Sequence, residues 1–457
     1  MADSKRESFK SRIGFLMVSA GCAIGVGNIW KFPWLCGQNG GGIFVLFYLI
    51  FLVVLGIPVM SMEFAVGRAS RQSTVKGFRK LEPKGSGWHV YGYFAIAGNV
   101  LLMMFYTSVA GWLINYFVKF LTGYFSSDMP VEAVTGTFGQ MLSSVPQSLI
   151  YAAIAIIAGG VVCYLGVRKG VEKVTKVMMS CLLVLIVILA INSLTLRNAG
   201  EGLLFYLVPD FEKAAEIGYS NIIVSAMNQA FFTLSLGIGA MEIFGTYMSE
   251  KNSITGEAVR ITILDTFVAL MAGLIIFPAC FSFGINPGAG PELIFITLPN
   301  VFINMAGGRI WGSLFFLFMV FAAMSTVIAV FENIIASFMD LLGWSRKKST
   351  IVTTVGVLIL SLPVIFEYNL LEGFQILRGR GRGPLDSWDF LVSNLLLPIG
   401  SLIYLMFCCS KAGWGYENFI AECNKGTGMR FPRGKVVAFF VKFCIPVLII
   451  FILVMGL

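Results

Sequence analysis

Apolar residues gather into eleven stretches, each long enough to cross a bilayer as a helix of about 20 residues. Polar and basic residues lie between these stretches. The pattern predicts an all-α polytopic membrane protein, a single transmembrane domain over residues 1–457. The predicted spans are 13–36, 42–67, 90–122, 147–167, 174–196, 220–247, 258–285, 309–342, 350–368, 387–410 and 435–456.

Composition agrees with this interpretation. The chain is 57% hydrophobic and 12% charged with a mean hydropathy of +0.84, whereas a soluble domain has about one quarter charged residues. The net charge of +9 does not indicate a nucleic-acid partner, because the basic residues form short clusters between apolar stretches. The lipid bilayer is the expected partner.

The basic residues predict an orientation with the N-terminus in the cytoplasm, since cytoplasmic loops carry an excess of Lys and Arg. The exception is Arg378, Arg380 and Arg382, in a Gly-Arg run that falls on the outer side. The segment GINPGAGPELIFITLPNVF, between spans 7 and 8, is expected to fold back as a short helix. The expected cytoplasmic basic residues are Arg68, Arg71, Lys76, Arg79, Lys80, Lys84, Arg168, Lys169, Lys173, Lys176, Arg346, Lys347, Lys348, Lys411, Lys425, Arg430 and Arg433.

The numbers and positions of histidine and cysteine limit the kinds of catalytic and metal site that the chain could form. His89 is the single histidine, which leaves little scope for His-based catalysis or haem ligation. The nine cysteines lie mostly within apolar stretches without paired spacing, so neither a disulfide framework nor a zinc site is indicated. The basic N-terminal segment MADSKRESFKSR lacks a cleavage site and is expected to be retained.

The first predicted span contains GCAIGVGNIWKFP, residues 21–33, which breaks the rules of a membrane helix. Three glycines weaken the helix, Asn28 and Lys31 bring polar groups to membrane depth, and Pro33 removes a backbone donor. Broken backbone persists in lipid only where protein buries it or where it lines a polar cavity. The alternative is a packing face made by Gly21 and Gly25 with a functionless kink.

A second break lies five spans later, in FFTLSLGIG at residues 231–239. Both breaks contain a G-x-G, with Asn28 beside the first, and Thr233 and Ser235 beside the second. An offset of five spans gives the two copies opposite orientations, which is typical of inverted repeats around a midplane site. The predicted repeats cover about 12–196 and 220–410, and an extra helix covers 435–456. A dinucleotide-binding site is excluded because no βαβ unit surrounds either motif.

Span 8 adds adjacent hydroxyls at Ser325 and Thr326, and Glu332. Such hydroxyls often bond their own helix backbone. They also offer oxygen ligands, which hard cations such as Na⁺ select. Broken-helix carbonyls could complete the set.

Four motifs in fixed order, GNIWKFP, QNGGGIF, MEFAVGR and FFTLSLGIG, resemble those of the neurotransmitter:sodium symporter family, bacterial amino-acid branch. The resemblance runs from about residue 6 through span 10. It implies two inverted five-helix repeats plus C-terminal helices. Most members have twelve spans and eleven are predicted here, so the resemblance leaves a homodimer open.

The resemblance implies two sodium sites. The first would use the carbonyl of Ala23 with the side chains of Asn28, Thr233 and Asp265, and the substrate carboxylate. The second would use carbonyls of Gly21, Ile24 and Ala322 with the hydroxyls of Ser325 and Thr326.

The resemblance also implies a substrate pocket. The substrate carboxylate would meet Tyr106 and the backbone near Gly25 and Gly27, and its amine would meet the carbonyls of Ala23, Phe232 and Ser235. Without the resemblance, ordinary helix packing would explain the apolar members. The implied lining of the side-chain pocket is Leu102, Phe232, Ile238, Ala329 and Val330.

The same resemblance implies which residues would close the substrate site on its outer and inner sides. Phe232 would be the lid, and Lys31 with Asp389 the outer ion pair, although the family usually has Arg at position 31. The inner gate would be Arg6, Tyr247 and Asp340, with Phe9 where Trp is common. Ser180 stands ten residues after Gly170, where many members have Pro.

These implications predict a Na⁺-coupled symporter of apolar L-amino acids in the plasma membrane. Asp265 is expected to supply the negative charge that chloride supplies in other members, where Asn and Ser occupy the places of Asp265 and Ala269. Another small amine or an osmolyte is the alternative cargo. A channel would show pore-lining rings or filter loops. An enzyme built on Glu63 and Glu332 lacks a nucleophile or metal motif, so both glutamates are interpreted as caps of unwound segments.

Overall fold

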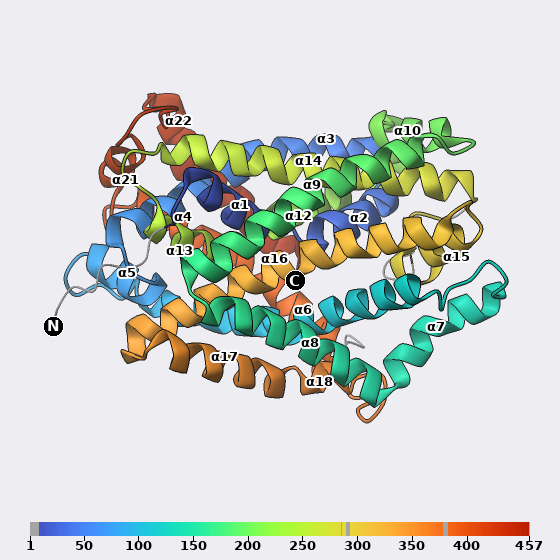
Figure 1. Cartoon of the computed structure of the whole chain (residues 1–457). Helices are drawn as coiled ribbons and strands as arrows, with labels where there is room; N and C mark the ends of the chain where they lie inside the picture. The colour runs from blue at the N-terminus through green and yellow to red at the C-terminus, as the bar shows by residue number, and fades with distance from the viewer. Residues whose placement is uncertain (1–8, 285, 289–292, 378–382, 457) are drawn as a thin grey trace.

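The structure is a computed structural model that describes residues 9–284, 286–288, 293–377 and 383–456. It is almost entirely helical (Figure 1). Within those ranges, nine helical stretches are long and apolar enough to cross a membrane. The all-α membrane fold predicted from the apolar pattern is therefore confirmed.

The nine stretches are α3 (Gly42–Phe51) with η2 (Leu52–Gly56) and α4 (Ile57–Ser70); α6 (Val90–Thr122); α8 (Val145–Tyr164); η3 (Val167–Glu172) with α9 (Lys173–Leu194); α14 (Ile254–Ser282); α16 (Gly308–Leu342); α17 (Arg346–Leu360) with α18 (Leu362–Ile365); α19 (Pro384–Phe390) with η5 (Leu391–Leu396) and α20 (Leu397–Cys409); and α22 (Lys435–Phe439) with η6 (Phe440–Cys444) and α23 (Ile445–Gly456).

Two further spans are broken where the sequence predicts it. α1 (Arg12–Ala23) is followed by η1 (Gly27–Lys31) and α2 (Phe32–Gln38), and the two parts are bent by 52°. α12 (Tyr219–Thr233) and α13 (Ala240–Tyr247) are separated by the second G-x-G. Counting the first pair as one span gives ten, and counting α12 with α13 gives the predicted eleven, which stays a prediction.

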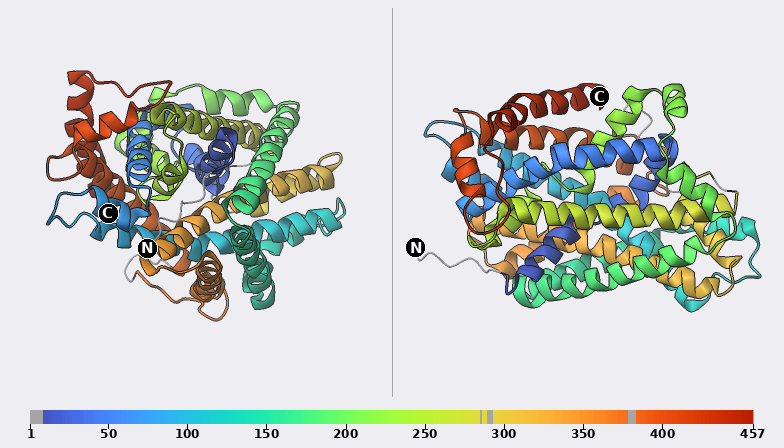
Figure 2. Two further views of the ribbon diagram at one scale, coloured as in Figure 1. Left: turned by 60° about the vertical axis from the view of Figure 1, so that its left-hand side comes forward. Right: turned by 90° about the horizontal axis from the view of Figure 1, so that it is seen from above.

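The long helices run side by side between two ends of the molecule (Figure 1). The α5 end holds α5 (Thr74–Leu81), α13 and α21 (Tyr416–Cys423). The α7 end holds α7 (Val131–Ser143), α10 (Ala199–Leu207) and α15 (Leu298–Ile303). In an 18-residue apolar window of α16, 78% of the residues are buried, whereas the corresponding window of the C-terminal helix is 28% buried and this helix lies on the outside (Figure 2). The centre of the bundle is therefore built around α16, α6 and the two broken spans.

The segments between the long helices were predicted only in part. The fold-back helix between spans 7 and 8 is present as η4 (Leu293–Thr297) and α15, as predicted. However, α7, α10 and α11 (Phe211–Ile217) are helices that lie between the predicted spans, where no helix was predicted. Each is short or amphipathic, so the search for apolar stretches of about 20 residues missed it. The Gly-Arg run from 378 to 382 lies outside the described residues.

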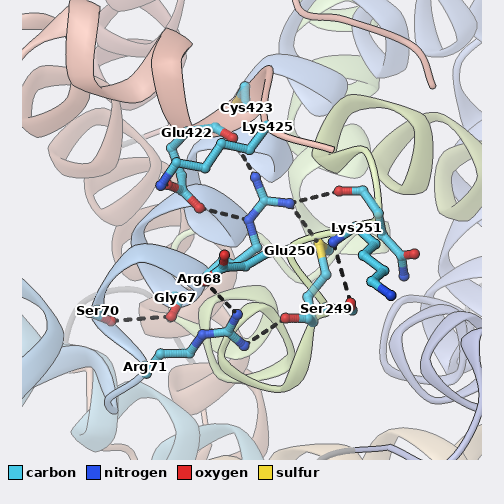
Figure 3. Close-up of polar contacts among 12 residues, drawn as sticks. Gly67, Arg68, Ser70, Arg71, Ser249, Glu250, Lys251, Glu422, Cys423 and Lys425 are labelled. Carbon is cyan, nitrogen blue, oxygen red and sulfur yellow. Dashed lines mark hydrogen bonds and ion pairs between the residues drawn. The ribbon is translucent and has the colours of Figure 1, made fainter. Parts of the chain in front are cut away.

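A buried ion pair ties α4 to the α5 end (Figure 3). The Arg68 guanidinium is 2.7 Å from Glu422 of α21, and it also donates to the backbone carbonyls of Glu422 and Asn252. Next to it, Arg71 donates to the carbonyls of Thr246 and Met248 at the end of α13. Thus α4 connects the end of a broken span to the segment before the last helix.

Replacing Glu422 by Gln should lower the free energy of unfolding by about 3 kcal/mol, because it leaves a buried guanidinium without a counter-charge. Thermal and denaturant unfolding in detergent would measure the change. Glu417→Gln is the matched control, since Glu417 is exposed on the same short helix. Equal stability of the two variants would contradict a structural role for the pair.

Candidate substrate and sodium site

The first helix break is satisfied by side chains from three elements. α1 ends at Ala23, and the amide N–H groups of Gly25 and Val26 donate to the Asn28 side chain at 3.0 Å and to Tyr106 Oη at 3.0 Å. Gln229 of α12 donates to the carbonyl of Gly27 at 2.9 Å. The broken backbone is therefore buried and paired, as a helix break in a membrane requires.

The second break, between α12 and α13, is held by a different set of groups. Ser235, Gly237 and Gly239 have positive φ values of 52°, 91° and 72°. The Gly237 N–H donates to Glu63 at 2.5 Å, and Tyr91 Oη donates to the Gly237 carbonyl. The expectation that Glu63 caps an unwound segment is confirmed. Any side chain at Gly237 would collide with the Leu397 backbone, so glycine is required there.

The two breaks face each other. Ser235 Oγ of the second break donates to the carbonyl of Cys22, at the end of α1, at 3.1 Å. Between them lies a small cavity to which α6, α16 and the η5–α20 junction also contribute. Its lining residues are Cys22, Ala23, Gly25, Gly27, Leu102, Tyr106, Phe232, Ser235, Ile238, Thr326, Val392 and Leu397.

The cavity gathers all the predicted pocket residues except two. Ala329 and Val330 are buried in α16 but lie outside the lining, so their contact with substrate stays a prediction. Cys22, Val392 and Leu397 line the cavity and were not predicted; Cys22 follows directly after the predicted Gly21. Val392 and Leu397 lie among many similar leucines and valines in span 10, and only the packing of the chain brings them to the site.

Oxygen atoms cluster at two places beside the cavity. At the first, the Asp265 carboxylate accepts from the Asn28 side chain at 2.8 Å and from Thr233 Oγ1 at 3.0 Å, and Asp265 is fully buried. Because η1, α12 and α14 each contribute a residue, both helix breaks are joined through this carboxylate.

The second cluster lies between α1 and α16. Ser325 Oγ is 2.9 Å from the Ala322 carbonyl and 3.4 Å from that of Ile24. Thr326 Oγ1 is 3.3 Å from the Gly21 carbonyl. Apart from the Asn28 amide nitrogen at the first cluster, the groups named at both clusters are oxygen atoms, which suits a hard monovalent cation. In the part of the chain that the structure describes, no group of three or more His, Cys, Asp or Glu could hold another metal.

A model of the sodium:neurotransmitter symporter family matches residues 6–138 and 140–457. The chain belongs to this family. It is 33% identical to an uncharacterized sodium-dependent transporter of Bacillus subtilis, YhdH, over 99% of this chain and 98% of that protein. It is 25% identical to the sodium- and chloride-dependent GABA transporter 2 of Bos taurus, over 91% of this chain and 75% of that protein.

A solved structure of MhsT in complex with L-phenylalanine superposes with a TM-score of 0.89 at 36% identity, covering 99% of this chain and 100% of MhsT. Family membership makes the protein a sodium-dependent, multi-pass membrane transporter and not an enzyme. Sodium is its coupling ion.

The expected outer gate lies on the α7 side of the cavity. Lys31 Nζ is 3.2 Å from both Asp389 Oδ2 and Ser393 Oγ, and 4.0 Å from the centre of the Phe232 ring. Phe232 lines the central cavity and also a larger one that includes Trp30. The three predicted gate residues therefore stand together where the two cavities meet, and their gating role remains a proposal.

The expected inner gate lies only partly within the described residues. Arg6 lies outside the described residues. Tyr247 donates to Glu332 at 2.8 Å, and Asp340 accepts from the Ser73 N–H at 2.6 Å. Glu332 also forms an ion pair with Arg346 at 2.7 Å, so the expectation that it caps an unwound segment is wrong. A carboxylate such as Glu332 within an apolar span is expected to have a charged or hydrogen-bonding partner, but the sequence does not indicate which residue provides it.

Glu367 lies in the loop between α18 and α19, next to Tyr368, which lines the larger cavity. Burial raises its pKa to about 7 from the ordinary 4.5, although the Leu385 N–H, at 2.7 Å, lowers it; nearby Asp386 raises it further. The folded state thus binds this proton more tightly than the unfolded state. The resulting stabilisation is present below about pH 4.5 and is lost as pH rises through 7.

Replacing Glu367 by Gln should therefore remove a pH-dependent loss of stability. The thermal midpoint of the variant, relative to the unmodified protein, should increase between pH 4.5 and pH 8. Glu372→Gln, at an exposed position of the same loop, should show no such trend. A parallel pH profile for all three proteins would contradict the raised pKa.

Proposed function

We propose that this transporter is a Na⁺-coupled symporter of apolar L-amino acids in the plasma membrane, working by alternating access with its N-terminus in the cytoplasm. The observation that carries the proposal is the chemistry of the central cavity. One side offers Tyr106 Oη and the backbone around Gly25, and the other offers Leu102 and Ile238. A main-chain carboxylate and amine fit the polar side, and an uncharged side chain fits the apolar one.

The apolar half of the cavity argues against charged substrates. Leu102, Ile238, Val392 and Leu397 provide no partner for a charge, and burying an unpaired charge is costly. The L-phenylalanine bound to MhsT, a structure of the same fold, supports an apolar amino acid here as well. The two halves of the chain, 12–196 and 220–410, would be inverted repeats, with one break in each.

Uptake into proteoliposomes tests the proposal. A panel of labelled amino acids from alanine to tryptophan, with lysine and glutamate, would be supplied with and without an inward Na⁺ gradient. Apolar members should accumulate only with the gradient. Competition by lysine or glutamate as strong as that by leucine or tryptophan would contradict the pocket. Accumulation of an amine or osmolyte instead would favour the alternative cargo.

Two sodium sites are part of the proposal, and they couple to substrate because the first shares the substrate carboxylate. Coupling is reciprocal, so sodium would bind well only with substrate present. The first site would use Ala23, Asn28, Thr233 and Asp265. The second would use Gly21, Ile24, Ala322, Ser325 and Thr326. The oxygen clusters described above support both assignments.

Asn28→Ala and Thr326→Ala should each raise the Na⁺ concentration for half-maximal substrate binding, by about tenfold. Each replacement removes an oxygen that a hard cation would use. Scintillation proximity binding over a Na⁺ series measures the shift. Thr137→Ala, a buried threonine of α7 whose hydroxyl bonds its own helix, is the control. Unchanged Na⁺ dependence in both site variants would overturn the two-site assignment.

A further inference from the structure

The carbonyl of Ile238 is held by a pair of buried asparagines from two other helices. Asn99 of α6 donates to it through Nδ2 at 2.8 Å, and Asn333 of α16 approaches it at 3.5 Å. Asn333 Nδ2 also donates to Asn99 Oδ1 at 3.0 Å. Asn99 and Asn333 are only 1% and 2% exposed. Since an amide oxygen accepts while its nitrogen donates, Asn333 fixes the orientation in which Asn99 faces Ile238.

Ile238 is the residue through which this pair reaches the substrate cavity. It lies between Gly237 and Gly239, whose φ values of 91° and 72° are left-handed, and its side chain lines the cavity. Ile238 lies outside both helices, since α12 ends at Thr233 and α13 begins at Ala240. Its carbonyl, buried in protein, would be costly to leave unpaired. The asparagine pair supplies the bond and thereby fixes Ile238.

α6 holds the side chain of Ile238 as well as its carbonyl. A Cβ built on Gly98 would lie 3.2 Å from Ile238 Cγ2. The glycine therefore leaves the space in which the isoleucine side chain rests, and the next residue, Asn99, bonds its carbonyl. Glu63 and Tyr91 bind the neighbouring Gly237.

We propose that Asn99 and Asn333 are positioning residues which, through Ile238, fix the size of the cavity that receives the substrate side chain. This inference rests on the proposed function. In an apolar pocket one methylene changes discrimination by about 10- to 200-fold. A small displacement of Ile238 would therefore appear as a change in the preferred size of the substrate, and not as a uniform loss of binding.

The test is a competition profile with alanine, valine, leucine, phenylalanine and tryptophan at saturating Na⁺, against a labelled substrate found in the uptake panel. In Asn99→Ala, Ile238 loses the hydrogen bond that fixes it, so the pocket should favour substrates with larger side chains. The ratio of the affinity for the largest bound amino acid to that for the smallest should increase by about fivefold. The Na⁺ concentration for half-maximal binding should stay within about twofold. Asn333→Ala should act in the same direction, and the double variant should exceed Asn99→Ala by little, because Asn333 acts through Asn99.

Two further variants make the test robust. Gly98→Ala keeps both amides but presses on Ile238, so it should shift the ratio toward smaller amino acids. Asn115→Ala removes another buried amide of α6, about 24 Å along the helix from Asn99, and should leave the ratio unchanged. An equal loss of affinity for every amino acid, or a shift as large in Asn115→Ala, would overturn the inference. An unmodified protein that binds and transports no amino acid would instead overturn the proposed function and the inference with it.

Discussion

Replacing Gly25 by aspartate is expected to abolish amino-acid binding. A Cβ at this position would lie 2.5 Å from Tyr106 Oη and 2.6 Å from Thr326 Oγ1, so the room beside the break exists because the residue is a glycine. An aspartate would fill that room with a carboxylate where the substrate carboxylate is proposed to bind. Repulsion between two carboxylates held together strongly disfavours having both charged. Scintillation binding of a labelled substrate should fall below detection.

Comparison with Gly25→Asn separates charge from bulk. The asparagine side chain has nearly the same shape as that of aspartate but carries no charge. A greater loss of substrate affinity in Gly25→Asp than in Gly25→Asn therefore measures the repulsion between the two carboxylates. The unmodified protein should also bind an α-amino acid and not its decarboxylated amine, such as tryptophan and not tryptamine, when that amino acid is a substrate. Equal affinity for the two members of such a pair would contradict the proposal that Gly25 makes room for a substrate carboxylate.

Much of the site could be predicted because its residues violate local rules. Glycines at 25 and 237 weaken membrane helices, and Asn28 and Asp265 are costly in apolar spans. Each is therefore visible in the sequence as an exception. In the structure Gly25 lines the cavity, Gly237 precedes Ile238, which also lines it, and Asn28 donates to Asp265 nearby. The offset of five spans between the two breaks predicts that they meet in this way.

Residues that obey local rules were not predicted. Val392 and Leu397 are ordinary members of an apolar span, and only tertiary packing distinguishes them from their neighbours. The pairing of Glu332 with Arg346 joins different helices, so no local pattern indicates it. The asparagine pair at Ile238 could be predicted in part. Asn99 and Asn333 are visible as buried amides, but the carbonyl that they bind is known only from the fold.

We expect the Asp265 carboxylate to act directly on a bound sodium ion. It accepts hydrogen bonds from Asn28 and Thr233, which belong to the two broken spans, and it is fully buried. Within the described residues, no Lys, Arg or His forms an ion pair with it. An Asp in an apolar span costs about 2.5 to 3.5 kcal/mol on the insertion scale, so a cation bound beside it would offset an otherwise unfavourable charge.

We expect transport by the unmodified protein to be independent of chloride, because Asp265 would supply the negative charge itself. Two unit charges about 4 Å apart interact by about 4 kcal/mol at an effective dielectric constant of about 20. Asp265→Asn removes that charge while keeping nearly the same shape. Na⁺-driven uptake in chloride-free buffer should fall at least about tenfold.

Added chloride is the decisive condition for this variant. Ala269, one turn along α14, is the place where chloride-dependent relatives are expected to have Ser, so Asp265→Asn combined with Ala269→Ser should regain uptake as chloride is raised. Measuring uptake against chloride, with gluconate as the replacement anion, distinguishes a lost charge from a damaged fold, because an anion restores only the former. A chloride requirement in the unmodified protein, or normal uptake by Asp265→Asn without chloride, would show that the carboxylate does not take the place of the anion.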